Sequence, residues 1–419
     1  MKSKTSKLLN ELIELHPKYI DLSLDRLKKL LEKIGDPHLD LPKTIHIAGT
    51  NGKGSVLSFI RNILILNGYS CDAYISPHLT KFNERIILNN KEVSESKLYK
   101  TLQYIKRINN NNEITFFEIT TAAAFFLFQR SKSDFLILET GLGGRLDATN
   151  IIPKKLCSII TPISFDHQEF LGNTIKQITN EKLGIVKNNK FTIISKQKPL
   201  VIKYIKNKLK KQNNIFFYNK EYKIKKILDK NFEFEIDKKK LVIKKPKLNG
   251  SHQIENASVA IAFAKIIKNY ETKVNLNKLS KAIKNTTWPG RLEILKFNDK
   301  KIILDGSHNI DGSIKLVNFL KKNKIKAITI FGMLKNKKIK SFLNTIKKQI
   351  NKILAVSIPE EKNAFTSNDI NEVCNSLSID CIQKKNINEV LKYILKSKEN
   401  VFLVTGSLYL VGKIRKKFL

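Results

Sequence analysis

The sequence predicts an α/β protein with two domains: an N-terminal P-loop-type domain with a parallel central sheet, and a smaller C-terminal Rossmann-like α/β domain. Three observations predict this fold. A short apolar run at Ile45–Ala48 leads through a glycine loop into an apolar helical segment. Further buried-type strands alternate with helical segments along the chain. The same alternation restarts after Trp288, so we place the domains at 1–288 and 289–419.

The glycine loop, Gly49–Ser55, joins a predicted strand to a helix predicted for 56–67. Backbone N–H groups at such a turn, together with the helix N-terminus, favour a bound phosphate. Lys53 would add charge for the β- and γ-phosphates, and the Ser55 hydroxyl could reach Mg²⁺. The spacing departs from the standard P-loop, because only two residues separate the first glycines and Gly54 follows the lysine. The alternative is a βα turn that needs its glycines for packing alone.

Composition argues against a nucleic-acid-binding protein, a membrane-spanning protein and a cysteine metal site. The formal net charge is +40, which invites a nucleic-acid interpretation. However, only eight of the 77 Lys and Arg residues are Arg, and the lysines are spread along the chain, as AT-rich coding bias would produce. No apolar run approaches the ~20 residues that span a bilayer, and the four cysteines lack metal-type spacing. We therefore expect a cytoplasmic protein without nucleic-acid or membrane partners.

The predicted elements follow in chain order. Residues 1–40 are expected to form two helices, the second with Asp21 as its N-cap. Further helices are expected at 93–108, 119–128, 174–187 and from about 250 to 267. Strands are expected at 71–75, 135–138, 157–163, 302–304, 327–331, 353–357 and 401–405.

Polar residues follow three of the predicted strands. Ser76, Glu139 and His167 all stand at or just beyond strand ends, where an open α/β sheet places its ligands. Glu139 has the position of a Walker-B acid that holds Mg²⁺. Taken singly, a turn serine, a structural carboxylate and a satisfied structural histidine are the alternatives. For Glu139 we favour metal binding, whereas Ser76 stays open between a ligand-binding and a turn serine. His167 gains weight as a ligand because a third strand end places it beside the other two.

Other candidates stay open on local grounds. Glu118 begins an apolar helix, where a carboxylate also serves as a cap. Asn256 faces either the core or a nucleotide, and Lys182 in isolation would be surface filler. Asp305, between a strand and a helix, suits a hydrogen bond to nucleotide or substrate from across a cleft. Where Lys is the default, Arg at 85, 145 and 291 suggests a need for a guanidinium.

Taken together, the motifs resemble folylpolyglutamate synthase/dihydrofolate synthase, the folate branch of the Mur ligase superfamily. The resemblance covers nearly the whole chain in family order, and the string 141–150 is its most specific part. The motifs are Ala48-Gly-Thr-Asn-Gly-Lys-Gly-Ser55, Ser76-Pro-His-Leu79, Glu139, Gly141-Leu-Gly-Gly-Arg-Leu-Asp-Ala-Thr-Asn150, Asp166-His167, Glu181-Lys182, His252-Gln253, Pro289-Gly-Arg-Leu-Glu293 and Asp305-Gly-Ser-His-Asn309.

The resemblance implies a ligase that uses ATP and Mg²⁺ to join L-glutamate to a folate carboxylate through an acyl phosphate. Carried over by position, the ATP-binding residues are Gly52, Lys53, Gly54, Ser55, Asn256, Arg291 and Asp305. The implied metal ligands are Ser76, Glu139, His167 and Lys182, the last as a carbamylated N6-carboxylysine. Lys53, Lys182 and His167 are the implied catalytic residues.

The folate substrate follows from three further segments. Bifunctional bacterial members bind dihydropteroate through motifs that Asp21-Leu22-Ser23-Leu24, Thr115-Phe116-Phe117-Glu118 and Leu146-Asp147-Ala148 resemble. Ser23 replaces the usual Gly, a small departure that affects contacts more than chemistry. We favour both activities, with polyglutamylation alone as the alternative.

Three rivals remain. Another Mur-type ligase, such as a peptidoglycan-precursor enzyme, would normally carry an extra N-terminal domain, and the ~40 residues before the glycine loop are too few for one. A nucleic-acid-stimulated P-loop ATPase would ignore pterins. An inactive folate-binding module is disfavoured because every implied ligand position is filled. We expect a monomer acting on small-molecule substrates.

Overall fold

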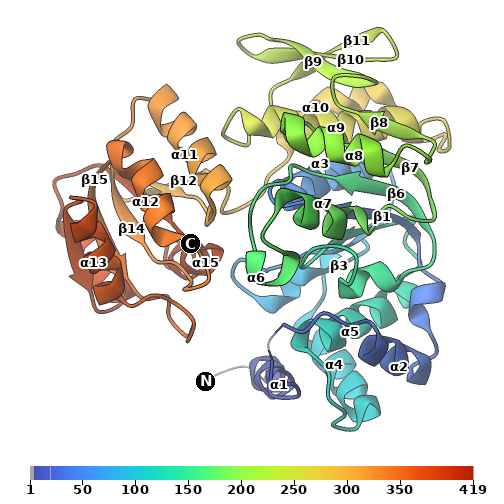
Figure 1. The fold of residues 1–419 in the computed structure, drawn as a ribbon, viewed down its shortest axis with the longest axis horizontal. Helices are drawn as coiled ribbons and strands as arrows, with labels where there is room; N and C mark the ends of the chain where they lie inside the picture. Colours follow the sequence, from blue (N-terminus) through green and yellow to red (C-terminus); the bar gives the residue numbers. More distant parts are fainter. Residues whose placement is uncertain (1–3, 19, 419) are drawn as a thin grey trace. The chain divides into compact units, whose positions relative to one another are not determined.

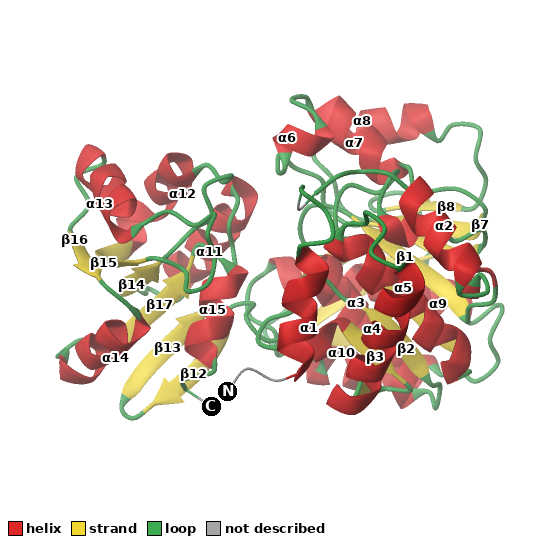
Figure 2. Ribbon diagram, turned by 90° about the horizontal axis from the view of Figure 1, so that it is seen from below, coloured by secondary structure: helices red, strands yellow, loops and turns green. Residues whose placement is uncertain are grey.

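The computed structural model describes residues 4–18 and 20–418. The chain divides into two compact units, coloured along the sequence in Figure 1. The first unit contains residues up to Ile163, Gln168–Lys245 and Glu255–Asn285; the second contains Ser164–His167, Pro246–Ile254 and the chain from Thr286 onward. Helices lie on both sides of the main sheet in each unit (Figure 2), which is the expected α/β arrangement.

The first unit is built on an eight-stranded sheet with the order β4-β3-β2-β5-β1-β6-β7-β8. The six strands from β2 to β8 in that order are parallel, and β3 and β4 form an antiparallel edge. The strands are β1 Lys43–Ala48, β2 Cys71–Tyr74, β3 Ile86–Leu88, β4 Lys91–Glu92, β5 Phe135–Glu139, β6 Lys155–Ile160, β7 Asn189–Ile194 and β8 Ile215–Phe217. The predicted parallel central sheet is confirmed.

Helices cover this sheet because its strands are apolar on both faces, so each face needs its own layer. Leu136 and Leu138 of β5 join the core beneath α1, α2, α4 and α5, while α3 contacts β1, β2 and β5. The helices of this unit are α1 Lys4–Ile13, α2 Asp25–Lys33, α3 Lys53–Leu66, α4 Glu95–Asn109, α5 Phe116–Ser131, α6 Gln168–Leu171, α7 Ile175–Leu183, α8 Pro199–Lys208, α9 His252–Ile267 (whose first residues group with the second unit) and α10 Leu279–Asn285.

A small antiparallel sheet, β11-β10-β9, accounts for the lysine-rich stretch of the first unit. Its strands are β9 Tyr222–Ile227, β10 Asn231–Ile236 and β11 Lys239–Lys244. Strand β10 alternates buried Phe232, Phe234 and Ile236 with half-buried residues, so only one face joins a core.

The second unit repeats the α/β pattern on a six-stranded sheet, β12-β13-β17-β14-β15-β16. Only the edge pair β12–β13 is antiparallel. Its strands are β12 Glu293–Phe297, β13 Lys300–Leu304, β14 Ala327–Phe331, β15 Ile350–Val356, β16 Cys381–Lys384 and β17 Val401–Thr405. Its helices are α11 Ile310–Lys322, α12 Ile339–Ile346, α13 Ser367–Ser376, α14 Ile387–Lys396 and α15 Leu408–Arg415.

Short 3₁₀ turns complete both units: η1 Pro37–Leu39, η2 Phe82–Arg85, η3 Ala148–Ile151, η4 Leu276–Lys278 and η5 Lys347–Gln349. Among the described residues, no helix is both long enough and apolar enough to cross a membrane.

One predicted helix start is wrong. Helix α2 begins at Asp25 with Leu24 at its N-cap position, so Asp21 does not cap it. Asp21 lies instead in the preceding loop, where its carboxylate pairs with Arg26 of the first helical turn. The cap preference of Asp reflects a local hydrogen bond, and here a guanidinium takes the carboxylate.

Candidate active site

Gly49–Gly52 of the glycine loop lie between the end of β1 and the first residue of α3, with Gly52 at the helix N-cap in a left-handed conformation (φ 89°). Lys53–Ser55 form the first turn of α3. The loop is fastened by Thr50 and Asn51, whose backbone N–H groups donate to the Pro162 carbonyl at 2.9 and 3.3 Å. The first N–H groups of a helix have no partner within the helix. The predicted strand, loop and helix are therefore confirmed, and the helix N-terminus is available to an anion.

Two glycines of the loop have no room for a side chain. A Cβ atom on Gly49 would lie 1.9 Å from the Thr161 hydroxyl oxygen, and one on Gly52 would lie 2.6 Å from Asn256 Oδ1. The second contact shows that Asn256, on the second turn of α9, lies directly against the loop. Asn256 is 5% exposed, so it is a buried amide beside the glycine loop, and its binding of a nucleotide stays a prediction.

Two lysines converge on the same backbone oxygen of this loop. Lys53 Nζ donates to the Gly49 carbonyl at 3.2 Å, and Lys182 Nζ, from the last turn of α7, donates to it at 3.1 Å. Lys182 is only 4% exposed and so is not surface filler. Two ammonium groups at a helix N-terminus create a local excess of positive charge, which favours binding of an anion such as a polyphosphate.

Ser76 and Glu139 meet at the carboxyl ends of the paired strands β2 and β5. The Ser76 backbone N–H donates to Glu139 Oε2 at 3.3 Å, and Glu139 is 5% exposed. The Ser76 hydroxyl oxygen is buried and has no hydrogen-bond partner among the described residues. An orphaned hydroxyl oxygen beside a buried carboxylate offers the hard oxygen donors that Mg²⁺ prefers, so these two residues fit a metal ion.

The predicted residues His167, Asp305 and Arg291 belong to the second unit. Asp166, next to His167, accepts a hydrogen bond from Lys337 Nζ on Oδ1 at 2.6 Å and one from Asn309 Nδ2 on Oδ2 at 3.1 Å. His308 Nε2 lies 3.4 Å from the same Oδ2. His167 Nε2 lies 3.2 Å from Lys337 Nζ. Burial alone would raise the pKa of Asp166, but the charges of His308, His167 and Lys337 outweigh it and hold that pKa well below its usual range.

Asp305 follows β13, as predicted, and is 5% exposed. Its carboxylate accepts from the backbone N–H groups of Leu292 (3.0 Å) and Ser307 (3.2 Å). Burial raises the pKa of Asp305, while the nearby Arg291 charge opposes the rise. A Cβ on Gly306 would lie 2.5 Å from Arg291 Nη1, so this glycine makes space for the guanidinium.

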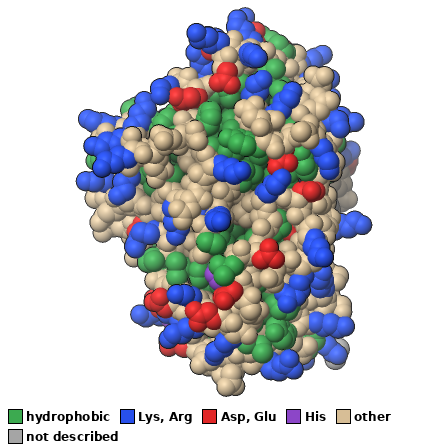
Figure 3. Space-filling view, turned by 90° about the vertical axis from the view of Figure 1, so that its right-hand side faces the viewer, with side chains coloured by type: hydrophobic (Ala, Val, Ile, Leu, Met, Phe, Trp, Pro, Cys, Tyr) green, Lys and Arg blue, Asp and Glu red, His purple; other side chains and the backbone are tan. Residues whose placement is uncertain are grey.

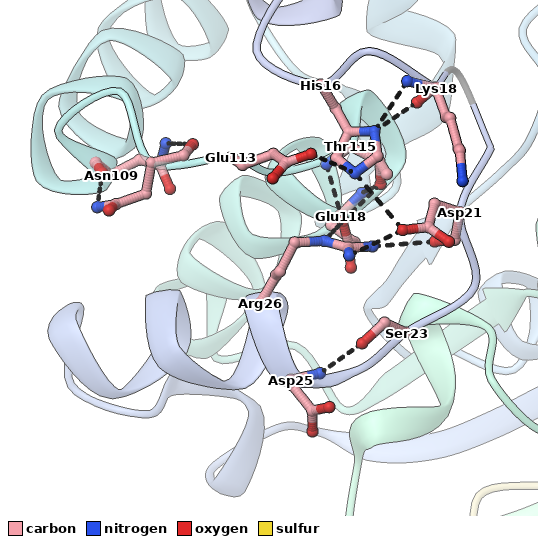
Figure 4. A network of polar contacts seen from close by, with 11 residues as sticks. His16, Lys18, Asp21, Ser23, Asp25, Arg26, Asn109, Glu113, Thr115 and Glu118 are labelled. Carbon is pink, nitrogen blue, oxygen red and sulfur yellow. Dashed lines mark hydrogen bonds and ion pairs between the residues drawn. The ribbon is translucent and has the colours of Figure 1, made fainter.

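The two N-terminal segments with folate-type motifs lie together, as Figure 4 shows. Arg26 joins them: its Nε donates to Glu118 Oε2 at 3.1 Å and its Nη1 to Asp21 Oδ2 at 2.9 Å. Glu118 completes a capping box with Thr115, so the predicted capping role is confirmed. Phe116 is buried and Phe117 half-buried, with the Phe117 ring stacked on Tyr74 at 5.8 Å between centroids.

The third segment is mostly buried. Asp147 is 2% exposed, and its oxygens accept from the Leu142 backbone N–H at 2.7 Å and the Thr149 backbone N–H at 3.1 Å. Leu146 is half-buried and Ala148 buried. Asp147 therefore shapes the loop 141–150.

Sequence reasoning missed two residues of these networks, Arg26 and Lys337, and also the buried Lys155, whose Nζ donates to Asn150 Oδ1 at the end of the string 141–150. Arg26 carried a usable signal, because it is one of only eight arginines in a lysine-rich chain. Lys337 and Lys155 carried none, since lysine is the background residue here.

Comparisons with known proteins agree with this geometry. Residues 47–264 match the Mur ligase middle domain and residues 291–417 match the dihydrofolate synthetase C-terminal domain. A dihydrofolate synthase/folylpolyglutamate synthase of Bacillus subtilis is 30% identical over 94% of both chains. Escherichia coli FolC in complex with DHPP and ADP superposes with a TM-score of 0.87 at 26% identity, covering 99% of this chain and 97% of that one.

A second solved structure is a bifunctional folylpolyglutamate synthase/dihydrofolate synthase with Mn, AMPPNP and L-glutamate bound. It has a TM-score of 0.85 at 25% identity and covers 99% of this chain and 98% of its own. The fold, the family-model matches and the full-length relatives agree with one another. The chain therefore belongs to the dihydrofolate synthase/folylpolyglutamate synthase family of Mur ligases, ATP-dependent enzymes that form carbon–nitrogen bonds.

Proposed function

We propose that this enzyme ligates L-glutamate to dihydropteroate, giving dihydrofolate, and to the γ-carboxylate of tetrahydrofolate polyglutamates. ATP phosphorylates the substrate carboxylate, and the glutamate amine then attacks the acyl phosphate, releasing phosphate as the amide forms. The observation that carries the proposal is the convergence of Lys53 and Lys182 on the Gly49 carbonyl at the start of α3. Both activities appear in the name of the Bacillus subtilis relative.

In this reaction the glycine loop binds the ATP phosphates through Gly52, Lys53, Gly54 and Ser55. Donor and acceptor are both anionic, so Lys53 lowers their repulsion and stabilises the phosphoryl group in transfer. Asn256, Arg291 and Asp305 complete nucleotide binding. Asn256 and Asp305 are both buried, and the hydrogen bond from the Leu292 backbone N–H holds the Asp305 carboxylate in the fixed geometry that binding requires.

Ser76, Glu139, His167 and Lys182 would hold Mg²⁺, with Lys182 as a carbamate. Bound Mg²⁺ supplies charge stabilisation to the transferring phosphoryl group. Carbamylation adds carbon dioxide to the neutral Lys182 amine with loss of a proton, and the resulting carbamate is an anionic oxygen donor.

The pteridine substrate is bound by the three folate-type segments. Their residues are Asp21, Leu22, Ser23, Leu24, Thr115, Phe116, Phe117, Glu118, Leu146, Asp147 and Ala148. Phe117 offers a flat, half-buried ring at the start of α5, and Glu118 offers a carboxylate oxygen that accepts hydrogen bonds. These are the group types that recognise a planar ring with N–H donors.

The decisive experiment measures phosphate release with ATP, Mg²⁺ and L-glutamate, adding dihydropteroate or tetrahydrofolate separately. Turnover is expected with each. Turnover with tetrahydrofolate alone would reduce the function to polyglutamylation, and no turnover with either would refute it. DNA and RNA are added in parallel, and stimulation by them without a pterin would support the P-loop ATPase instead.

The carbamate is tested directly. Lys182→Ala is expected to lose most activity, with short-chain carboxylates restoring part of it, and ¹³C-bicarbonate is expected to give a carbamate signal in the wild type alone. An unimpaired Lys182→Ala enzyme would refute the role. The matched control is Lys187→Ala, an exposed lysine just beyond α7.

We propose further that the enzyme acts as a cytoplasmic monomer on small molecules, with domains at 1–288 and 289–419. On the face drawn in Figure 3, Lys and Arg side chains are scattered and Asp and Glu stand among them. Such an even spread supports incidental basicity, since nucleic-acid binding uses a clustered footprint. Size-exclusion chromatography with light scattering tests the monomer, and a dimer mass would overturn it.

A further inference from the structure

The contact between Arg26 and Glu118 has a geometry that only a guanidinium can supply. Arg26 Nε donates to Glu118 Oε2 at 3.1 Å, Nη1 to Asp21 Oδ2 at 2.9 Å and Nη2 to the Asp21 backbone carbonyl at 3.1 Å. The planar fork thus joins the Asp21 loop to Glu118, which lies 92 positions from Arg26, as Figure 4 shows. A lysine ammonium is a point charge and cannot reproduce this spread of donors.

The two carboxylate oxygens of Glu118 differ in their hydrogen bonds. Its Oε2 accepts from Arg26 and also from the Thr115 backbone N–H at 2.8 Å and the Thr115 hydroxyl at 2.7 Å. Its Oε1 is buried and has no hydrogen-bond partner among the described residues, although the residue is only 3% exposed. A buried carboxylate oxygen without a donor is costly, so Oε1 is suited to a donor that a ligand brings.

The Asp21 loop is held from a second side as well. His16 Nε2 lies 3.5 Å from Asp21 Oδ2 and 3.2 Å from Glu113 Oε1, and the His16 side chain is buried. Asp21 itself is more than one-third exposed. The loop 20–24 is therefore fixed at one edge by Arg26 and His16 and stays accessible at the other.

We infer that Arg26 is a positioning residue for pteridine binding: it fixes the loop 20–24 against the start of α5 and orients Glu118 so that Oε1 accepts a hydrogen bond from an N–H group of the ring. This inference rests on the proposed dihydropteroate activity. It assigns Arg26 no contact with ATP or L-glutamate. Loss of Arg26 should therefore weaken binding of the pteridine substrate and leave the nucleotide site intact.

The test compares Arg26→Gln and Arg26→Lys with the wild type and with Arg130→Gln as a matched control. Arg130 is exposed on the same helix as Glu118 and, among the residues that the structure describes, donates to the Phe126 carbonyl and Gln129 of its own helix. Initial rates give KM for dihydropteroate, ATP and L-glutamate, intrinsic pterin fluorescence gives the Kd for dihydropteroate, and thermal unfolding checks that each variant folds.

For Arg26→Gln we expect KM and Kd for dihydropteroate to rise about tenfold or more, with KM for ATP changed less than about twofold. Arg26→Lys should recover part of the loss, because it keeps the charge without the fork. Arg130→Gln should match the wild type. Unchanged dihydropteroate binding in Arg26→Gln, or an equal loss for all three substrates, would overturn the inference.

The two possible failures are separable. If wild-type enzyme neither binds nor converts dihydropteroate, the proposed function fails and the inference with it. If the wild type turns over normally and a folded Arg26→Gln enzyme is indistinguishable from it, the inference alone fails. Should Arg26→Gln not fold, Arg26→Lys decides the matter, because an unchanged Kd in that variant would remove the need for a guanidinium.

Discussion

Lys155 should make the stability of the first unit depend on pH in a way that one substitution removes. This lysine begins β6, is 5% exposed, and donates from Nζ to Asn150 Oδ1 at 3.0 Å and to the Ile185 carbonyl at 2.7 Å. Burial, with a smaller contribution from Lys187, lowers the pKa of Lys155 from 10.5 to about 7. The folded protein therefore binds this proton more weakly than the unfolded chain does.

The sign follows from linkage. Between about pH 7 and 10.5 the unfolded chain holds more protons at this lysine, so stability rises with pH across that window. At 1.36 kcal/mol per pKa unit, the two pKa values give a gain of about 2 kcal/mol between pH 7 and pH 9. Lys155→Met keeps the length of the side chain but cannot titrate, so it loses this gain.

The measurement is urea unfolding followed by circular dichroism at pH 7 and pH 9. Lys155→Met should lose about 2 kcal/mol of free energy of unfolding relative to the wild type as the pH rises from 7 to 9. The adjacent, exposed Lys154 supplies the control, because Lys154→Met should track the wild type at both pH values. A difference between Lys155→Met and wild type that is the same at both pH values would refute the reasoning.

Two glycine substitutions test the nucleotide site. Gly49→Ala should abolish ADP binding measured by calorimetry, because the added Cβ would lie 1.9 Å from the Thr161 hydroxyl oxygen. Gly68→Ala is the control: its positive φ also strains the alanine, but the space around it is open, so this variant should bind ADP normally. Gly306→Ala should displace Arg291 and raise KM for ATP about tenfold, by loss of a charged contact; an unchanged KM would remove Arg291 from nucleotide binding.

Much of the site was predictable, because parallel sheets bring strand ends together. The sequence places Ser76 and Glu139 after two separate strands, and the parallel pairing of β2 with β5 brings them within 3.3 Å. A helix after the glycine loop was also predictable, although α3 begins at Lys53, three residues before the predicted start at Val56. These features depend on local pattern and sheet topology, which one sequence encodes directly.

The rest was not predictable, because it depends on contacts between distant side chains. Arg26 and Glu118 are 92 positions apart, and no periodicity links them. The misplaced cap at Asp21 has a different, local cause: propensity favours capping, but the carboxylate is taken by the guanidinium of Arg26, five residues along the chain. Lys337 and Lys155 were hidden by composition, since a buried lysine looks like any other in a lysine-rich chain.

The string 141–150, the most specific motif in the sequence, acts largely through the end of α7. The Arg145 backbone N–H donates to the Glu181 carbonyl at 2.8 Å, and Asn150 Nδ2 donates to the Gly184 carbonyl at 3.1 Å. A Cβ on Gly144 would lie 2.7 Å from the Glu181 carbonyl oxygen, so the string and the helix end are in direct contact. Lys182 lies within this clamped turn.

The Lys182 ammonium can reach the Gly49 carbonyl only if the end of α7 is held in place. Lys155 adds to the same clamp, because its two acceptors are Asn150 and the Ile185 carbonyl, on either side of the contact. The string 141–150 therefore serves to position Lys182 at the end of α7. A side chain that must sit within about 3 Å of a phosphate loop needs a rigid support, and the string 141–150 supplies it.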